Sequence, residues 1–238
     1  MKRKKMVVAL LVLAACVGVA VFGVFGLHRD PVPEGMPTTP PEGAGWIDLL
    51  DAEHASAWKN TTDDEDIFEI DEGMLHIFGT SFVHLRYADY TAGSFGDFDL
   101  HLEFKVAKGT NSGVFVRSQP NDPVYRGFEI QVLDDFGKAP HKNRSGAIYD
   151  VTTPMYNLSR PAGEWNSYDI QVHGHEVKVV MNGWLVVHTD LSKMTMLIGK
   201  YKAPFAELPL EGHLMLQDHG GEVWYRNILI REGTPASS

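Results

Sequence analysis

Three short segments of alternating polarity carry the side chains that could do chemistry on a polar ligand. In an extended strand, successive side chains point to opposite faces, so every second residue shares a face. That rule places Glu129 and Gln131 on one face of their segment. It also groups Gly113 and Phe115 with Arg117 in the second segment, and His213 and Met215 with Gln217 and His219 in the third. If the three segments are neighbours, their shared face suits a sugar, which needs partners for its hydroxyls and rings for its C–H face. The alternative is that these groups are solvated residues on the outer face of an antiparallel sheet.

The elements that would position these residues are strands. Residues 98–106 alternate apolar and polar side chains at every position, and Asn182-Gly183 is a strong signal for a two-residue hairpin. Further strands are expected at 73–78, 83–87, 113–117, 128–133, 170–172, 177–181, 185–188, 213–217 and 222–231, with a turn at Gly174 between the two segments of 170–181. No part of the body has a long helical period. The sequence therefore predicts an all-β fold, a two-sheet antiparallel β-sandwich of the jelly-roll type, preceded by an N-terminal apolar helix.

The N-terminus has the pattern of an export signal. A basic cluster at residues 2–5 precedes Val7–Leu27, which contains no charged residue and as a helix would match the thickness of a bilayer core. The basic flank should stay in the cytoplasm, which puts the body outside it, at the bacterial cell envelope. Three alternatives remain for residues 1–27: an uncleaved membrane anchor, a cleaved signal, or a lipoprotein. In the last case Leu13-Ala14-Ala15-Cys16 resembles a lipobox and Cys16 is the lipidated residue.

The rest of the chain divides into a linker, a body and a tail. Residues 28–45 are rich in proline and have no apolar periodicity, so we expect an extended, semi-rigid tether. The β-sandwich is predicted to span residues 46–232, and residues 233–238 form a short tail.

Charge and cysteine content exclude several classes of function. The net charge is −10, and several of the few basic residues lie in the first five positions. An exported body this acidic would repel phosphate backbones, so no nucleic-acid partner is expected. Cys16 is the single cysteine, which excludes an intrachain disulfide, a cysteine-based zinc site and a thiol nucleophile in the body.

Several of these segments resemble one known family. Residues 111–117 read NSGVFVR, which is similar to the NSG-x-F-x-R signature of the 3-keto-disaccharide hydrolase family. Further matching segments follow in the family's order at 127–134, 146–149, 161–166, 182–183, 216–220 and 226–228. The resemblance implies a concanavalin-A-like sandwich, exported and often tethered to the bacterial envelope. The Met-rich segment 191–208 does not match and has no assigned role.

The activity that this resemblance implies is cleavage of the glycosidic bond of 3-keto-disaccharides or related oxidised glycosides. A 3-keto group acidifies the neighbouring C2 proton, so a base can remove it while an electrophile holds the enolate oxygen. The leaving group then departs from C1, and addition of water completes a net hydrolysis. This elimination–hydration route needs one base and one oxyanion stabiliser rather than the paired carboxylates of ordinary glycosidases.

The resemblance also suggests roles for individual residues. Glu129 and His219 are the candidates for proton transfer. The candidates for holding the sugar or stabilising negative charge are Asn111, Arg117, Gln131, Gln217 and Trp165, although Trp165 could equally anchor the start of a strand. No cofactor is certain. A divalent cation such as calcium could assist, with Glu129 and Asp218 as oxygen ligands, or Asp218 could only cap a turn.

A second class of function stays open at this point. A non-catalytic carbohydrate-binding β-sandwich could keep the same sugar-holding face without turning over its ligand. The expected partners are thus an oxidised disaccharide or glycoside and, through residues 1–27, a membrane.

Overall fold

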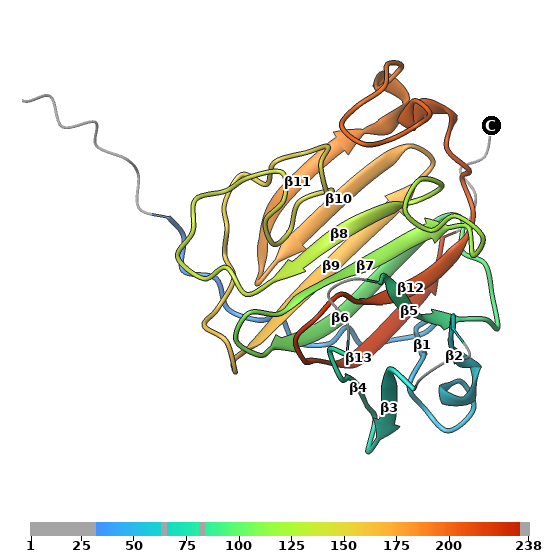
Figure 1. Ribbon diagram of the computed structural model, residues 1–238, viewed down its shortest axis with the longest axis vertical. Coiled ribbons are helices and arrows are strands. Elements are labelled where there is room, and N and C mark those ends of the chain that lie inside the picture. The colour runs from blue at the N-terminus through green and yellow to red at the C-terminus, as the bar shows by residue number, and fades with distance from the viewer. Residues whose placement is uncertain (1–31, 63–65, 81–83, 234–238) are drawn as a thin grey trace, which may run out of the picture. The chain divides into compact units, whose positions relative to one another are not determined.

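The computed structural model describes residues 32–62, 66–80 and 84–233 of the chain (Figure 1). The predicted apolar helix, the 1–27 signal or anchor segment and Cys16 lie outside these residues, as do positions 234–238 of the predicted tail. Within the described ranges, no helix is long and apolar enough to cross a membrane.

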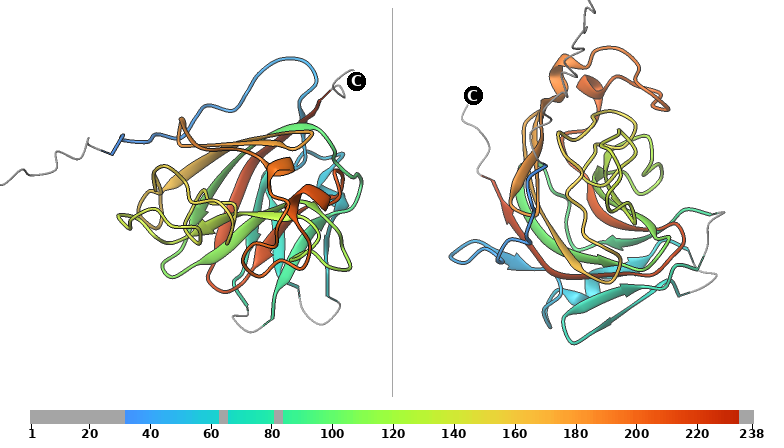
Figure 2. Two further views of the ribbon diagram at one scale, coloured as in Figure 1. Left: turned by 90° about the horizontal axis from the view of Figure 1, so that it is seen from above. Right: turned by 90° about the vertical axis from the view of Figure 1, so that its left-hand side faces the viewer.

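Two antiparallel sheets make up the body (Figures 1 and 2). The eight-stranded sheet has the order β11 (Trp184–Asp190), β10 (Glu176–Met181), β9 (Trp165–His173), β6 (Phe98–Val106), β13 (Val223–Glu232), β4 (Met74–Ile77) and β3 (Phe68–Asp71), and β1 (Ile47–Asp48) also pairs with β13. The five-stranded sheet has the order β2 (Trp58–Asn60), β5 (Arg86–Tyr90), β12 (His213–Asp218), β7 (Asn111–Ser118) and β8 (Phe128–Leu133). The described helices are single 3₁₀ turns at Ala55–Ala57, Leu191–Lys193 and Phe205–Glu207. The predicted all-β, two-sheet antiparallel sandwich is therefore confirmed.

The apolar alternation of the strands builds the core between the two sheets. In β6, Phe98, Leu100, Leu102 and Phe104 are almost completely buried and belong to one continuous cluster. Each such side chain contributes about 1.5–3 kcal/mol by leaving water, so a strand with this pattern is stable only with that face covered. The Asn182-Gly183 hairpin is also confirmed: both residues have positive φ, and Met181 pairs with Trp184 across the turn.

Part of the predicted linker is bound to the sandwich instead of being a free spacer. The Met36 N–H donates to the Asn182 carbonyl (3.0 Å), and the Thr38 N–H and hydroxyl donate to Ser167 Oγ (2.9 Å) and Asp169 Oδ2 (2.9 Å). An extended proline-rich chain leaves its remaining N–H groups unpaired, and here they find acceptors on the sandwich. The expectation of a tether over the whole of 28–45 is thus wrong for residues 35–38.

Candidate active site

The two faces of the five-stranded sheet carry different kinds of side chain. One face carries the apolar residues that close the sandwich core, among them Val114, Val116, Ile130 and Val132. The alternate positions form the opposite face, where a separate buried cluster is made of Tyr87, Phe115 and Met215. Glu129 alternates with Ile130 and therefore lies on this second face, which we call the polar face. The long connections 134–164 and 191–212 contact each other there, since the Lys200 N–H donates to Asp150 Oδ2 (2.8 Å).

A cavity of about 70 Å³ opens on the polar face. Its walls come from β7, β8, β12 and four connections, and they consist of Leu85, Asn111, Glu129, Tyr149, Lys200, Gln217 and His219. Both residues predicted for proton transfer are present, together with two of the predicted sugar-holding residues, Asn111 and Gln217. A cavity of this size takes only an edge of a sugar ring, which is the part that would react.

Glu129 is the buried acid of this cavity. Only 4% of its surface is exposed, and its carboxylate lies against Gly113 of the neighbouring strand. A Cβ atom at Gly113 would stand 2.5 Å from Glu129 Oε1, so a side chain at position 113 would displace the carboxylate. Burial raises the pKa of Glu129 to about 8, and the positive charge of Lys200 partly opposes this rise. The carboxyl group therefore exchanges its proton near neutral pH.

A chain of side-chain hydrogen bonds orients His219. Gln131 Nε2 donates to Asn111 Oδ1 (2.9 Å), which turns the Asn111 amide nitrogen toward His219 Nδ1 (2.7 Å). Because Nδ1 accepts this bond, the neutral imidazole carries its proton on Nε2. His219 thus offers an N–H donor at Nε2, and Gln131 acts from behind the cavity wall.

Unpaired polar atoms also point to a ligand. Gln217 Oε1 and Gln131 Oε1 are buried and have no hydrogen-bond partner among the described residues. A buried acceptor without a partner costs free energy, on the order of 1–3 kcal/mol, unless a ligand or water satisfies it. Gln217 lines the cavity, so a hydroxyl of a bound sugar would be a suitable partner.

Tyr149 and Lys200 are two cavity residues that the sequence did not identify. The Tyr149 N–H donates to the Glu129 carbonyl (2.9 Å), which holds residues 146–149 alongside β8. Lys200 Nζ lies 4.4 Å from the centroid of the Tyr149 ring. Tyr149 lies in 146–149, one of the segments that resemble the family, and this was the one indication in the sequence that it could be functional. Lys200 lies in the 191–208 segment, which has no periodicity, so nothing in the sequence placed it here.

Arg117 is not in the cavity, and the prediction that it shares the polar face is wrong. It adopts a left-handed conformation (φ 50°), which breaks the strict alternation of β7 after Phe115. Its guanidinium is almost fully buried and donates to the carbonyls of Gly96 (2.9 Å) and Gly174 (2.6 Å) and to Asp97 (3.2 Å). Arg117 thus ties the end of the five-stranded sheet to loops of the eight-stranded sheet.

Trp165 is also remote from the cavity. It begins β9 of the eight-stranded sheet, opposite Lys105, and lies on the outer side of that sheet. The Arg226 guanidinium carbon is 3.9 Å from the centroid of its ring, and Lys105 Nζ is 5.1 Å from it. The sandwich core separates Trp165 from Glu129, so the strand-anchor alternative holds and the sugar-binding prediction is wrong for this site.

The predicted pair of metal ligands, Glu129 and Asp218, does not come together. Asp218 alternates with Gln217 and lies on the other face of β12, where it accepts bonds from the Thr80 N–H (3.1 Å), the Thr80 hydroxyl (2.8 Å) and the Gly220 N–H (3.3 Å). Asp218 therefore fixes a turn. Over the described ranges there is no group of three or more His, Cys, Asp or Glu side chains that could hold a metal ion.

Comparison with known proteins places this geometry in a family. The family described as "3-keto-alpha-glucoside-1,2-lyase-like domain" matches residues 45–231. A protein named 3-keto-disaccharide hydrolase, from Bacteroides thetaiotaomicron, is 29% identical over 81% of this chain and 80% of its own length. The crystal structure of a protein assigned as a glycosyl hydrolase, from Parabacteroides distasonis, is 29% identical with a TM-score of 0.67, covering 79% of this chain and 99% of the other.

The same fold also occurs in proteins outside this family. A carbohydrate-binding module of Bacillus subtilis, CBM66, has a TM-score of 0.50 at 11% identity, over 74% of this chain and 96% of its own. At that identity the likeness concerns the fold alone. Because a binding module and hydrolase relatives share the sandwich, function has to be argued from the cavity.

Proposed function

Since this chain belongs to the 3-keto-alpha-glucoside-1,2-lyase-like family, we propose that it is an enzyme that cleaves the glycosidic bond of 3-keto-disaccharides or 3-keto-glycosides. One observation carries the proposal: a single buried carboxyl group, Glu129, faces an open cavity next to an oriented imidazole, His219. Glu129 is the one carboxylate that lines this cavity among the described residues. Ordinary glycosidases need two facing carboxylates.

The chemistry follows from the acidity of the C2 proton beside the ketone. Glu129 in its ionised form removes that proton, and the electron pair of the C2–H bond moves toward the C3 ketone oxygen as an enolate forms. The His219 Nε2–H stabilises the negative oxygen. When the enolate collapses, the C1–O bond breaks and the leaving oxygen takes the proton that Glu129 removed, which regenerates the carboxylate and leaves an unsaturated 3-keto sugar. Water then adds across the C1–C2 double bond and returns a proton to C2, giving net hydrolysis.

The raised pKa of Glu129 fits the role of a base. The strength of a carboxylate as a base increases with its pKa, and burial makes this one a stronger base that still loses its proton near neutral pH. Lys200 keeps part of the population ionised. A module that only binds sugars gains nothing from burying a titratable carboxyl group, and for that reason we favour the enzyme over the non-catalytic binding alternative.

The decisive experiment uses the full chain and a panel of 3-keto-disaccharides, with the unoxidised disaccharides as controls and each reaction run with and without a chelator. Mass spectrometry of the products should show cleavage of the keto substrates alone, because unoxidised sugars lack an acidic C2 proton. Glu129→Gln should lose about 10²–10⁴-fold in kcat with little change in KM. Glu53→Gln, at an exposed position, is the matched control.

The role of His219 has its own test. His219→Gln keeps an N–H donor and should retain more activity than His219→Ala, since the proposal gives the imidazole a hydrogen-bonding role. If the wild-type chain binds the keto sugars but cleaves none of them, the binding-module alternative is correct.

A further inference from the structure

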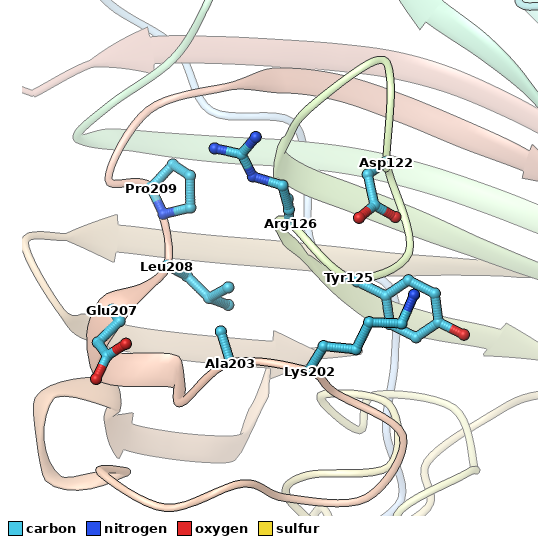
Figure 3. A pocket seen from close by; sticks show the side chains of 8 residues that line it. All are labelled: Asp122, Tyr125, Arg126, Lys202, Ala203, Glu207, Leu208 and Pro209. Carbon is cyan, nitrogen blue, oxygen red and sulfur yellow. The ribbon is translucent and has the colours of Figure 1, made fainter.

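A second and larger cavity, of about 340 Å³, opens between two connections of the polar face (Figure 3). One wall is the β7–β8 connection, which contributes Asp122, Tyr125 and Arg126. The other wall is the stretch after Lys200, which contributes Lys202, Glu207 and Leu208. None of these residues has a role in the chemistry described above.

Hydrogen bonds and packing fix the conformation of both walls. In the β7–β8 connection, the Gln119 N–H donates to the Arg126 carbonyl (2.8 Å) and the Arg126 N–H donates to the Asp122 carbonyl (3.0 Å). Gly127 closes this loop with positive φ, and a Cβ there would stand 2.5 Å from Ser118 Oγ. The other wall is anchored by Phe205, which is 1% exposed. The cavity is therefore preformed rather than opened by a ligand.

The lining has the composition of a sugar site. Leu208, Ala203 and Pro209 supply the apolar part of one wall, and charged side chains make up much of the remaining lining (Figure 3). Lys202 Nζ lies 4.0 Å from the centroid of the Tyr125 ring, so it covers one face of the ring and fixes its position. The two cations and two anions of the lining balance each other. This pattern suits a neutral ligand with many hydroxyl groups better than a phosphate or a carboxylate.

The same two segments connect this cavity to the reactive one. Arg126 precedes Glu129 by three residues, which in an extended chain is at most about 10 Å. Lys202 follows Lys200 by two residues, and these lysines line the second and the first cavity respectively. A ligand that inserts an edge of its reacting ring into the first cavity can therefore place a further sugar unit of its leaving group in the second.

We propose that the second cavity is a subsite for the leaving-group side of the substrate. It binds the second sugar unit on the leaving-group side of the scissile bond, with C–H groups against Leu208 and Tyr125 and hydroxyls on Arg126, Asp122 and Glu207. The substrate class is then a 3-keto-oligosaccharide whose keto ring is at the non-reducing end and whose leaving group is longer than one sugar. This inference rests on the proposed function.

The test compares substrates of two lengths and both anomeric types: the 3-keto derivatives of cellobiose and cellotriose and those of maltose and maltotriose. For the linkage that the wild-type chain cleaves, kcat/KM should be about tenfold or more higher for the trisaccharide than for the disaccharide, or ~1.4 kcal/mol. Tyr125→Ala and Arg126→Met should each bring this ratio close to one. Trp184→Ala, at an exposed aromatic residue on the eight-stranded sheet, should leave the ratio unchanged.

The outcomes separate this inference from the proposed function. Cleavage of both lengths at equal kcat/KM by the wild type, or a trisaccharide advantage that survives in both variants, overturns the subsite and leaves the proposed function standing. If the wild type cleaves no keto sugar, the proposed function fails. The subsite is then judged by calorimetric titration of the full chain with cellobiose and maltose: binding that weakens in Arg126→Met supports it, and no binding of either sugar refutes it. The wild-type length comparison decides the question even if a variant does not fold.

Discussion

Glu129 is the residue in which function and stability oppose each other. A carboxyl group with a pKa of about 8 in the folded chain and 4.5 in the unfolded chain binds its proton more tightly when folded. Between these two values the folded state loses stability as pH rises, because the buried group has to ionise. The ionised form of Glu129, which acts as the base, is therefore also the form that destabilises the folded state.

This opposition predicts the behaviour of Glu129→Gln in thermal unfolding. Glutamine is neutral at every pH, so the variant should gain stability over the wild type as pH increases from 5 to 9. Each pH unit within the window contributes at most about 1.4 kcal/mol, so the gain at pH 9 should be of the order of a few kcal/mol. Melting temperatures at pH 5, 7 and 9 measure it, with Glu53→Gln as control. A variant that is less stable than the wild type at pH 9 would show that the carboxylate is well solvated.

Lys200 offers an independent test of the same electrostatics. Its positive charge lowers the pKa of Glu129, so Lys200→Met should raise that pKa further. Glu129 acts as a base in its ionised form, and activity is lost as pH falls through its pKa. The ascending limb of kcat/KM against pH should therefore move to higher pH in Lys200→Met, while Lys178→Met on β10 leaves it in place. An unchanged limb in Lys200→Met would contradict the assignment of Glu129 as the base.

Strands with strict alternation of apolar and polar residues were predictable from the sequence, and irregular backbone was not. The predicted bounds of 98–106 and 128–133 agree with β6 and β8, because every position there is either core or opposite face. The grouping of Glu129 with Gln217 and His219 followed from the same rule once the strands were taken as neighbours, whereas Asn111 was a candidate through the family resemblance. The alternation rule failed for Arg117 because its left-handed conformation shifts the alternation by one position. The rule could not place Lys200, because the 191–208 connection has no apolar periodicity.

The position of Arg117 changes what its substitution should do. Its buried guanidinium has a pKa lowered to about 10 by burial, and it satisfies two carbonyls and Asp97. Arg117→Met leaves those acceptors unpaired, so unfolding should become easier by roughly 3–5 kcal/mol. Denaturant unfolding measures the loss. The KM of the folded fraction should stay near the wild-type value, and a raised KM without loss of stability would restore Arg117 as a sugar-binding residue.

The part of the linker that is hydrogen-bonded to the sandwich belongs to the folded body. Truncation tests this point: a chain that begins at Val32 keeps the contacts of Met36 and Thr38, whereas one that begins at Pro41 loses them. Three hydrogen bonds at about 1 kcal/mol each predict a clear drop in melting temperature for the shorter chain. Equal melting temperatures would mean that residues 32–40 contribute nothing to stability.

Export to the bacterial envelope remains our proposal for residues 1–27, on the basis of their basic flank and uncharged run. The same truncated chains extend the test, since both should stay in the aqueous fraction without detergent while the full chain sediments with membranes. Membrane association of the truncated chains would remove the reason to assign it to residues 1–27.

The fate of the C2 hydrogen shows whether the glycosidic bond breaks by proton abstraction at C2. A 3-keto-disaccharide labelled with deuterium at C2 of the keto ring is incubated with the full chain in ordinary water, and the released keto sugar is analysed by mass spectrometry. A parallel sample with Glu129→Gln corrects for uncatalysed exchange. If Glu129 removes the C2 proton and the leaving group departs by elimination, each cleaved molecule should have lost its label. Released keto sugar that retains deuterium at C2 would contradict the account, because the bond would then have been broken without proton abstraction.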